Sequence, residues 1–355
     1  MKKLILSEFH KSIGGKMVNF SGYYMPIHYK GIISEHLAVR DSVGLFDVSH
    51  MGEIFISGND AEKLLQFITS NNIEKIKEGQ VQYSCLLNEK GGIVDDLLIY
   101  KLKINQYMLV VNAANIEKDY KWICKNNEWN CSVDNFSEKY SLLALQGPNS
   151  LKLLQEITKD DISKINYYEF IRGNIGDLQN LIISRTGYTG ELGFEIYVKN
   201  DDVKILWDLM FKTNIHLEPI GLAARDTLRL EKGYCLYGNE INDQTTPIEA
   251  GLGWITDFNN DFIAKDSLLK KQENGFERRL IGLVLREKGI ARKDYEIFNS
   301  NNQNIGIITS GSISPSLKKP IALAYIDTKY NDGDTVYIEI RKKKLEAIIT
   351  KYPFL

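Results

Sequence analysis

Residues 91–100 read Gly-Gly-Ile-Val-Asp-Asp-Leu-Leu-Ile-Tyr, which places two adjacent carboxylates inside an apolar run. The glycine pair and the β-prone residues after it predict a strand that is buried on both faces. Successive side chains of a strand point to opposite faces, so Asp95 or Asp96 must enter a largely apolar space. A buried carboxyl group is hydrogen-bonded, protonated or used in chemistry. The strand alone leaves both a structural and a functional acid open.

Composition limits the remaining possibilities. A chain of 355 residues with 43% apolar content is expected to form two or three domains. The net charge of −2, from 44 basic and 46 acidic residues, gives no reason to expect nucleic acid or an anionic membrane as partner. We therefore expect a small molecule or another protein as the partner.

Cysteines and histidines form no recognisable metal pattern. The four cysteines lie far apart without a CxxC pair, which favours reduced, mostly buried thiols over disulfides or a zinc site. The first residues turn polar at Ser7 and Glu8, and no apolar run approaches the ~18 residues of a membrane span. We expect a cytoplasmic protein with no metal site.

Apolar spacing predicts an α+β protein. Strands are expected over 53–57, 141–146, 180–185 and 194–198, and a hairpin joins the strand that ends near Lys103 to one over 107–112. Helices are expected from Ala61, from a cap at Asn115, after Gly147-Pro148-Asn149, around Trp207 and over 222–231. Beyond residue 280 only short strands follow, over 281–285, 295–298, 305–309, 320–326, 335–341 and 345–350. This last pattern is typical of an all-β barrel or sandwich.

A glycine-rich segment, Gly187-Tyr188-Thr189-Gly190-Glu191-Leu192-Gly193, has the wrong spacing for a dinucleotide fingerprint. It places Tyr188 and Glu195 around a turn where the backbone can approach a flat ligand. The two carboxylate oxygens of Glu195 suit the adjacent N–H donors of a pterin or purine edge. A polar hairpin turn is the structural alternative.

The predicted helix 222–231 carries two arginines one turn apart. Arg225 and Arg229 share a face, with Asp226 and Glu231 nearby. A solvated salt-bridge face is the usual explanation for such a pattern.

Seven strings in order give the chain a family resemblance. They are GLFDVSHM at 44–51, GGIVDDLLIY at 91–100, VVNAANIEKD at 110–119, ALQGP at 144–148, SRTGYTGELGFE at 184–195, GLAARDTLRLEKGYCLYGNE at 221–240 and ITSGSISP at 308–315. Together they resemble the aminomethyltransferases of the glycine cleavage system, the T-protein family. The match is collinear from about residue 7 to residue 353.

The resemblance implies a three-domain cloverleaf ring around a central hole that binds tetrahydrofolate. Domain one is expected from residues 1–50 and 140–245, and domain two from the inserted residues 51–139. Residues 246–279 then connect to an all-β domain over 280–355.

The resemblance also assigns site residues. Asp96, the second acid of the GGxxDD string, matches the family's catalytic acid, which hydrogen-bonds the folate near N10 and orients N5. Glu195 and Arg225 match folate-binding positions. Other pocket positions are matched by Met51, Tyr83, Asn112, Tyr168, Tyr188, Trp254 and Arg292.

The implied reaction transfers the one-carbon unit of an aminomethyl group, held on the lipoyl arm of a carrier protein (the H-protein), to tetrahydrofolate. Ammonia, methylenetetrahydrofolate and the dihydrolipoyl carrier are the products. The reaction needs no strong protein nucleophile and no metal, which agrees with a sequence that lacks both patterns.

Two other functions share this fold. Iron–sulfur assembly proteins carry a KGCYxGQE-like string, whereas residues 232–240 read KGYCLYGNE, with the cysteine displaced and the glutamine absent. A folate-dependent demethylase would keep the folate residues and need no carrier protein. The displaced Cys235 favours the transferase over the assembly protein.

Overall fold

The computed structural model describes all 355 residues, which divide into two compact units. Unit 1 comprises Met1–Leu65, Ile73–Tyr83 and Leu97–Asp226, and unit 2 comprises Gln66–Asn72, Ser84–Asp96 and Thr227–Leu355. Helices and strands are mixed along the chain before residue 278, and strands alone follow, so the predicted α+β class is confirmed. The three-domain boundaries stay a prediction.

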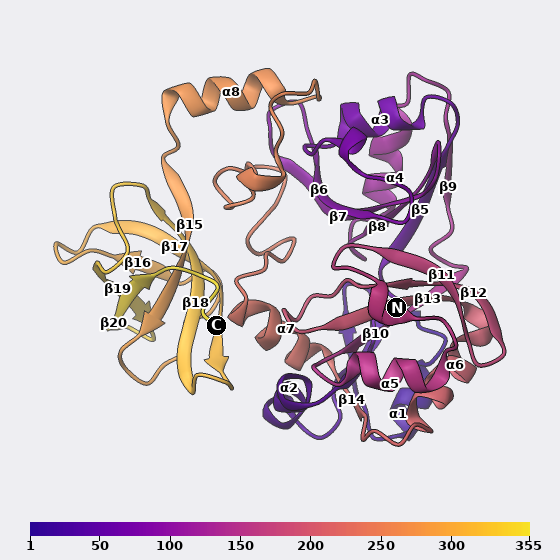
Figure 1. Ribbon diagram of the computed structural model, residues 1–355. Coiled ribbons are helices and arrows are strands. Elements are labelled where there is room, and N and C mark those ends of the chain that lie inside the picture. The colour runs from indigo at the N-terminus through magenta and orange to yellow at the C-terminus, as the bar shows by residue number, and fades with distance from the viewer. The chain divides into compact units, whose positions relative to one another are not determined.

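A six-stranded sheet forms a large part of unit 1, with the strand order β11-β12-β13-β10-β4-β14 (Figure 1). The strands are β4 (Gly44–Asp47), β10 (Tyr140–Gln146), β11 (Phe170–Ile175), β12 (Leu178–Ser184), β13 (Gly193–Lys199) and β14 (Glu218–Pro219). The helices α5 (Ser150–Ile157) and α6 (Val203–Phe211) share its hydrophobic core. The predicted strands 141–146, 180–185 and 194–198 are thus confirmed as β10, β12 and β13.

Alternation along β13 separates the core of this sheet from its polar face. Phe194, Ile196 and Val198 belong to the core cluster that includes α5 and α6. Glu195 and Tyr197 lie between them in sequence and therefore point to the opposite face. Glu195, the predicted folate residue, thus lies on the face opposite α5 and α6.

A second sheet has five strands in the order β6-β7-β8-β5-β9. The strands are β5 (Gly52–Ser57), β6 (Val81–Leu87), β7 (Ile93–Lys103), β8 (Gln106–Val111) and β9 (Ser132–Asn135). No residue of β7 before Lys103 is exposed, as the sequence predicts. The predicted hairpin is confirmed, because β7 and β8 pair in antiparallel register across a turn in which Asn105 has a φ of 57°.

Two helices accompany this sheet in sequence, α3 (Ala61–Ile68) and α4 (Ile116–Lys125). The apolar residues of one face of α3 are buried, namely Ala61, Leu64, Leu65 and Ile68. Asn115 stands at the N-cap of α4 as predicted, but its side chain makes no capping hydrogen bond. Its backbone φ of −106° and ψ of −5° are already helical, whereas a capping side chain needs extended backbone geometry.

The C-terminal part is a closed barrel with the strand order β15-β18-β17-β16-β19-β20. Its strands, orange to yellow in Figure 1, are β15 (Arg278–Leu285), β16 (Glu296–Phe298), β17 (Asn304–Ser314), β18 (Lys319–Asp327), β19 (Thr335–Ile340) and β20 (Lys343–Thr350). Aliphatic side chains from all six strands fill the interior. Of the two predicted architectures, barrel and sandwich, the barrel is therefore confirmed.

Some elements escape the sequence patterns. They are the sheet β1-β3-β2 (Lys2–Lys3, Tyr23–His28, Lys16–Phe20), the strands β4, β6, β9, β11 and β14, the helices α1 (Ser7–Ser12), α2 (Ile32–Asp41) and α8 (Lys265–Asn274), and the short 3-10 helices η1 (Ile73–Lys75), η2 (Ile162–Lys164), η3 (Asn200–Asp202) and η4 (Gly253–Ile255). Among the helices, none combines the length and apolar character needed to cross a bilayer.

Candidate functional site

The glycine pair before β7 fixes the strand that carries the two acids. Gly91 has a φ of +83°, a conformation that favours glycine. A Cβ at Gly92 would stand 1.8 Å from the carbonyl oxygen of Asp243, so only glycine permits this approach of two backbones. The amide of Ile93 donates to the carbonyls of Asn242 and Thr245 on the same segment. The start of β7 is therefore held by backbone contacts within unit 2.

Asp95 and Asp96 have different environments, as expected for neighbours on a strand. Asp95 is fully buried, whereas Asp96 is half-buried. The more accessible acid is the one that the family resemblance assigns to catalysis.

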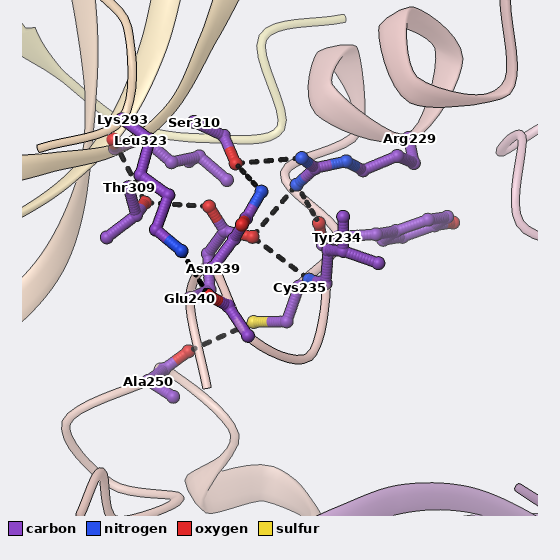
Figure 2. Close-up of polar contacts among 12 residues, drawn as sticks. Arg229, Tyr234, Cys235, Asn239, Glu240, Ala250, Lys293, Thr309, Ser310 and Leu323 are labelled. Atoms are coloured by element: carbon purple, nitrogen blue, oxygen red, sulfur yellow. Dashed lines mark hydrogen bonds and ion pairs between the residues drawn. The ribbon is translucent and has the colours of Figure 1, made fainter. Parts of the chain in front are cut away.

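Two cysteines lie within electrostatic reach of Asp96. Burial raises the pKa of Cys85 well above its usual range, and the negative charge of Asp96 raises it further. Burial also raises the pKa of Cys235, and Glu240 and then Asp96 add to the increase. The Cys235 thiol donates to the carbonyl oxygen of Ala250 over 3.9 Å (Figure 2). Both cysteines are thus held as protonated thiols, which are weak nucleophiles.

The glycine-rich turn surrounds a side chain of the protein. A Cβ at Gly187 or Gly193 would approach the Gln146 side-chain amide to within 2.4 Å. Gln146 donates to the carbonyl oxygen of Thr186 and accepts from the Thr189 hydroxyl. These two glycines therefore pack around Gln146, and the expected approach of this turn to a flat ligand stays a prediction.

Glu195 is the buried acid beside this turn. Its Oε2 accepts a 2.5 Å hydrogen bond from the Thr186 hydroxyl, and its Oε1 makes no hydrogen bond. Burial raises the pKa of Glu195, while the Thr186 hydrogen bond and the positive charge of Arg225 oppose that rise. One carboxylate oxygen is thus fixed by the protein, and the other remains available to a donor.

Arg225 lies on α7 (Leu222–Glu231) and contacts another predicted residue. Its guanidinium carbon is 4.5 Å from the centroid of the Tyr188 ring, within the range of a cation–π interaction. Because Arg225 also acts electrostatically on Glu195, the structure brings Tyr188, Glu195 and Arg225 together in unit 1.

The same helix disproves the predicted solvated face. Arg229 is 1% exposed, and its guanidinium donates to Glu240, to the carbonyl oxygen of Tyr234 and to Ser310 (Figure 2). Glu231 is also buried and accepts from the hydroxyls of Ser314 and Ser316. The interpretation fails because acceptors and hydroxyls far along the chain fold over this end of α7.

The other predicted pocket residues are distributed over both units. Unit 1 holds four half-buried ones, and unit 2 holds two exposed ones. They are Met51, Tyr83, Asn112 and Tyr168 in unit 1 and Trp254 and Arg292 in unit 2. Tyr168 has a φ of +62°, and Trp254 is 71% exposed. Trp254 therefore presents its ring at the surface of the protein.

Sequence reasoning missed the hydroxyl groups behind Glu195. Tyr100 on β7 approaches Ser184, Thr186 and Tyr197, and its hydroxyl oxygen is 2.9 Å from that of Tyr197. All four side chains are buried. Strand alternation could have placed Tyr197 on the face of Glu195, but nothing local indicates that Tyr100 meets it.

Comparisons with known proteins agree on one family. The GCVT N-terminal domain model matches residues 6–260, and the model of the glycine cleavage T-protein C-terminal barrel domain matches residues 278–355. An aminomethyltransferase of Flavobacterium psychrophilum is 49% identical over 100% of this chain and 99% of its own length. One of Bacteroides thetaiotaomicron is 46% identical over the same shares of the two chains.

A solved structure supports the same similarity. The crystal structure of the glycine cleavage system aminomethyltransferase T from Bartonella henselae has a TM-score of 0.94 and 35% sequence identity to this chain. The match covers 100% of this chain and 98% of that structure.

Proposed function

This chain belongs to the glycine cleavage T-protein family and is an aminomethyltransferase, and we propose that its acceptor is tetrahydrofolate. The donor would be the aminomethyl group on the lipoyl arm of a carrier protein, the H-protein. The products would be methylenetetrahydrofolate, ammonia and the dihydrolipoyl carrier.

The hydrogen bonding of the two Glu195 carboxylate oxygens is the main observation that supports folate binding. A buried carboxylate with one oxygen held by Thr186 and the other without a hydrogen bond suits adjacent N–H donors such as those of a pterin edge. Arg225 beside Tyr188 adds a cation and an aromatic face. These donor and acceptor groups fit a flat, N–H-rich ring with an anionic tail. When bound, tetrahydrofolate would supply the nucleophilic nitrogen.

We assign Asp96 the role of the catalytic acid. As a half-buried carboxyl it can reach a ligand, yet it is shielded enough to act as a positioned acid–base group. Its charge also raises the pKa of Cys85 and Cys235, which argues against a thiolate nucleophile here. Asp96 would hydrogen-bond the folate and hold a proton while the amine leaves.

The remaining pocket residues are proposed as contacts to the ring and tail of folate. Met51, Tyr83, Asn112 and Tyr168 present half-buried side chains, as a binding surface requires. Trp254 and Arg292 offer an exposed aromatic ring and an exposed cation. The cytoplasmic location also remains a prediction.

Assay of the purified protein with aminomethylated lipoyl carrier tests the proposal directly. Ammonia release should be fast with tetrahydrofolate and much slower without it. A demethylase of this fold would show no dependence on the carrier, and an iron–sulfur assembly protein would release no ammonia. Either result would overturn the proposed reaction.

Calorimetric titration tests the Glu195 contact separately. Glu195→Ala should weaken tetrahydrofolate binding by about 1.5–3 kcal/mol, the usual contribution of a charge-assisted hydrogen bond. Arg225→Ala should also weaken binding. Unchanged affinity in Glu195→Ala would remove that residue from the site.

A further inference from the structure

A connected set of buried hydroxyl groups ends on Glu195. Tyr197 contacts Tyr100 at 2.9 Å, Tyr100 contacts Ser184 at 3.2 Å and Thr186 at 3.3 Å, and Thr186 contacts Glu195 at 2.5 Å. All five groups belong to unit 1. This series of hydrogen bonds therefore leads from the two tyrosines to the acid that we propose as a folate contact.

The direction of the hydrogen bonds follows from counting protons. Each hydroxyl has one proton, and the only hydrogen-bond partner of the Tyr197 hydroxyl is the hydroxyl of Tyr100. Tyr197 is 1% exposed, so its proton must point to Tyr100 or remain buried without an acceptor. Tyr100 must then donate onward, to Ser184 or Thr186.

At the Glu195 end of this hydroxyl series, the donor direction follows from two distances. Thr186 lies 2.5 Å from Glu195 Oε2 and 3.0 Å from Ser184 Oγ, so its hydroxyl donates to the nearer carboxylate oxygen. If Oε2 were protonated and donated to Thr186, the Thr186 proton would have to turn to Ser184 Oγ, at the longer distance of 3.0 Å. The short hydrogen bond from Thr186 thus favours the ionised form of Glu195.

We propose that Tyr100 is a positioning residue that, through Thr186, keeps Glu195 ionised and leaves Oε1 free to accept N–H donors. The claim rests on the proposed folate function only for the identity of the ligand. Burial raises the pKa of Tyr100 and Tyr197, so both hydroxyls remain donors at every pH at which the protein is used. The two tyrosines cannot themselves become anions that compete with Glu195.

The charged groups around the chain act in known directions. Arg225 lowers the pKa of Glu195 from the side of α7. Glu53 on β5 acts on Tyr197, and burial raises its pKa well above its usual range, which favours the protonated form. His50 lies within reach of Arg225, and burial lowers its pKa to about 3. Burial therefore favours the neutral form of both Glu53 and His50.

The first experiment titrates Glu195 in the ligand-free protein. The infrared band of its protonated carboxyl is isolated as the difference between the wild type and Glu195→Gln, followed over pH. Tyr100→Phe removes only the hydroxyl and should move the titration to higher pH. Thr186→Val should move it further, and Thr186→Ser should restore it. An unchanged titration in both Tyr100→Phe and Thr186→Val would overturn the proposal.

The second experiment measures tetrahydrofolate affinity as a function of pH. Tyr100→Phe should bind about three- to tenfold more weakly than the wild type at low pH, with the loss shrinking as pH rises, because one pKa unit corresponds to a tenfold change. In the Glu195→Gln background the same substitution should have no pH-dependent effect. A loss that is equal at all pH values would assign Tyr100 a structural role only.

A matched control removes a different buried hydroxyl. Tyr325 donates to the carbonyl oxygen of Glu240 in unit 2 and has no contact with the hydroxyl groups that lead to Glu195. Tyr325→Phe should therefore leave the Glu195 titration unchanged. Failure of the wild type to bind tetrahydrofolate would refute the proposed function alone, since the infrared titration needs no ligand.

Discussion

Arg229 and Glu240 form an ion pair at 2.9 Å with 1% and 0% of their side chains exposed. The second carboxylate oxygen accepts from Thr309, and the backbone amide of Leu236 donates to the first. Arg229 also donates to Ser310 on β17 (Figure 2). The pair therefore connects α7, the segment after it and the barrel within unit 2, with its hydrogen-bonding capacity largely satisfied.

Removing one partner of this pair should be costly. Arg229→Met leaves the Glu240 carboxylate buried without its cation, and we expect a loss of about 3–5 kcal/mol in the free energy of unfolding. Urea unfolding followed by circular dichroism measures the change. The double variant Arg229→Met with Glu240→Gln should recover at least half of the loss, because the uncompensated charge is gone. If it recovers nothing, the loss reflects packing and not charge.

Asp96 and Asp95 should respond differently to the same substitution. Asp96→Asn should fold normally and lower turnover by roughly 10²–10⁴, the range for a positioned acid–base group. Asp95 is fully buried on the other face of β7, so Asp95→Asn should mainly change stability. Ammonia-release kinetics and thermal unfolding of both variants show which acid serves catalysis and which serves stability. Loss of activity in a folded Asp95→Asn protein with an active Asp96→Asn protein would reverse the assignment.

Glu53 should make stability fall as pH rises. Both of its carboxyl oxygens are buried without a hydrogen-bond partner, and burial raises its pKa well above the usual range. Above the ordinary pKa of glutamate the unfolded chain loses this proton while the folded chain keeps it. Glu53→Gln should therefore gain stability relative to the wild type by about 1.4 kcal/mol per pH unit from about pH 5 upward.

Glu62 provides a control of opposite sign for the Glu53 experiment. Lys101 lowers the pKa of Glu62, so its contribution to stability is present at neutral pH and lost in acid. The stability difference between Glu62→Gln and the wild type should vanish as pH falls. A flat difference for Glu53→Gln across the same range would show that Glu53 is ionised in the folded protein.

The cysteines should be largely inert. Of the four free thiols only Cys124 is exposed, so a thiol reagent such as DTNB should label the native protein rapidly at that position, and Cys124→Ser should abolish the fast phase. Cys235→Ala should keep activity within severalfold, apart from packing losses, because its protonated thiol has no chemical role. Complete loss of activity in a folded Cys235→Ala protein would instead support the function of an iron–sulfur assembly protein.

The predictable part of the fold is the part with regular apolar spacing. The hairpin β7–β8, the helix α7 and all six barrel strands follow from local patterns. The helix α2 and the short strands β1 and β14 do not, because their residues alternate irregularly and their stability depends on partners far along the chain. The closure of the barrel, likewise, is a pairing between distant strands.

For the site too, local motifs could be predicted, and contacts between residues distant in sequence could not. Motifs assigned Asp96, Glu195 and Arg225, and Tyr188 was expected beside Glu195 on the turn. The packing of Gly187 and Gly193 around Gln146 could not be predicted, because Gln146 lies about forty residues earlier. The surface interpretation of Arg229 failed for the same reason, since helical spacing shows which residues share a face but not what covers that face.

The closed barrel sets a condition on how the protein is made. Its first strand, β15, pairs with its last, β20, through contacts such as Gly282 with Thr350. During synthesis the earlier strands emerge while this partner does not yet exist, and both β15 and β19 then present open edges. A ribosome stalled before Lys343 would therefore leave an aggregation-prone intermediate, so we expect this region to depend on chaperones until the final strand is released.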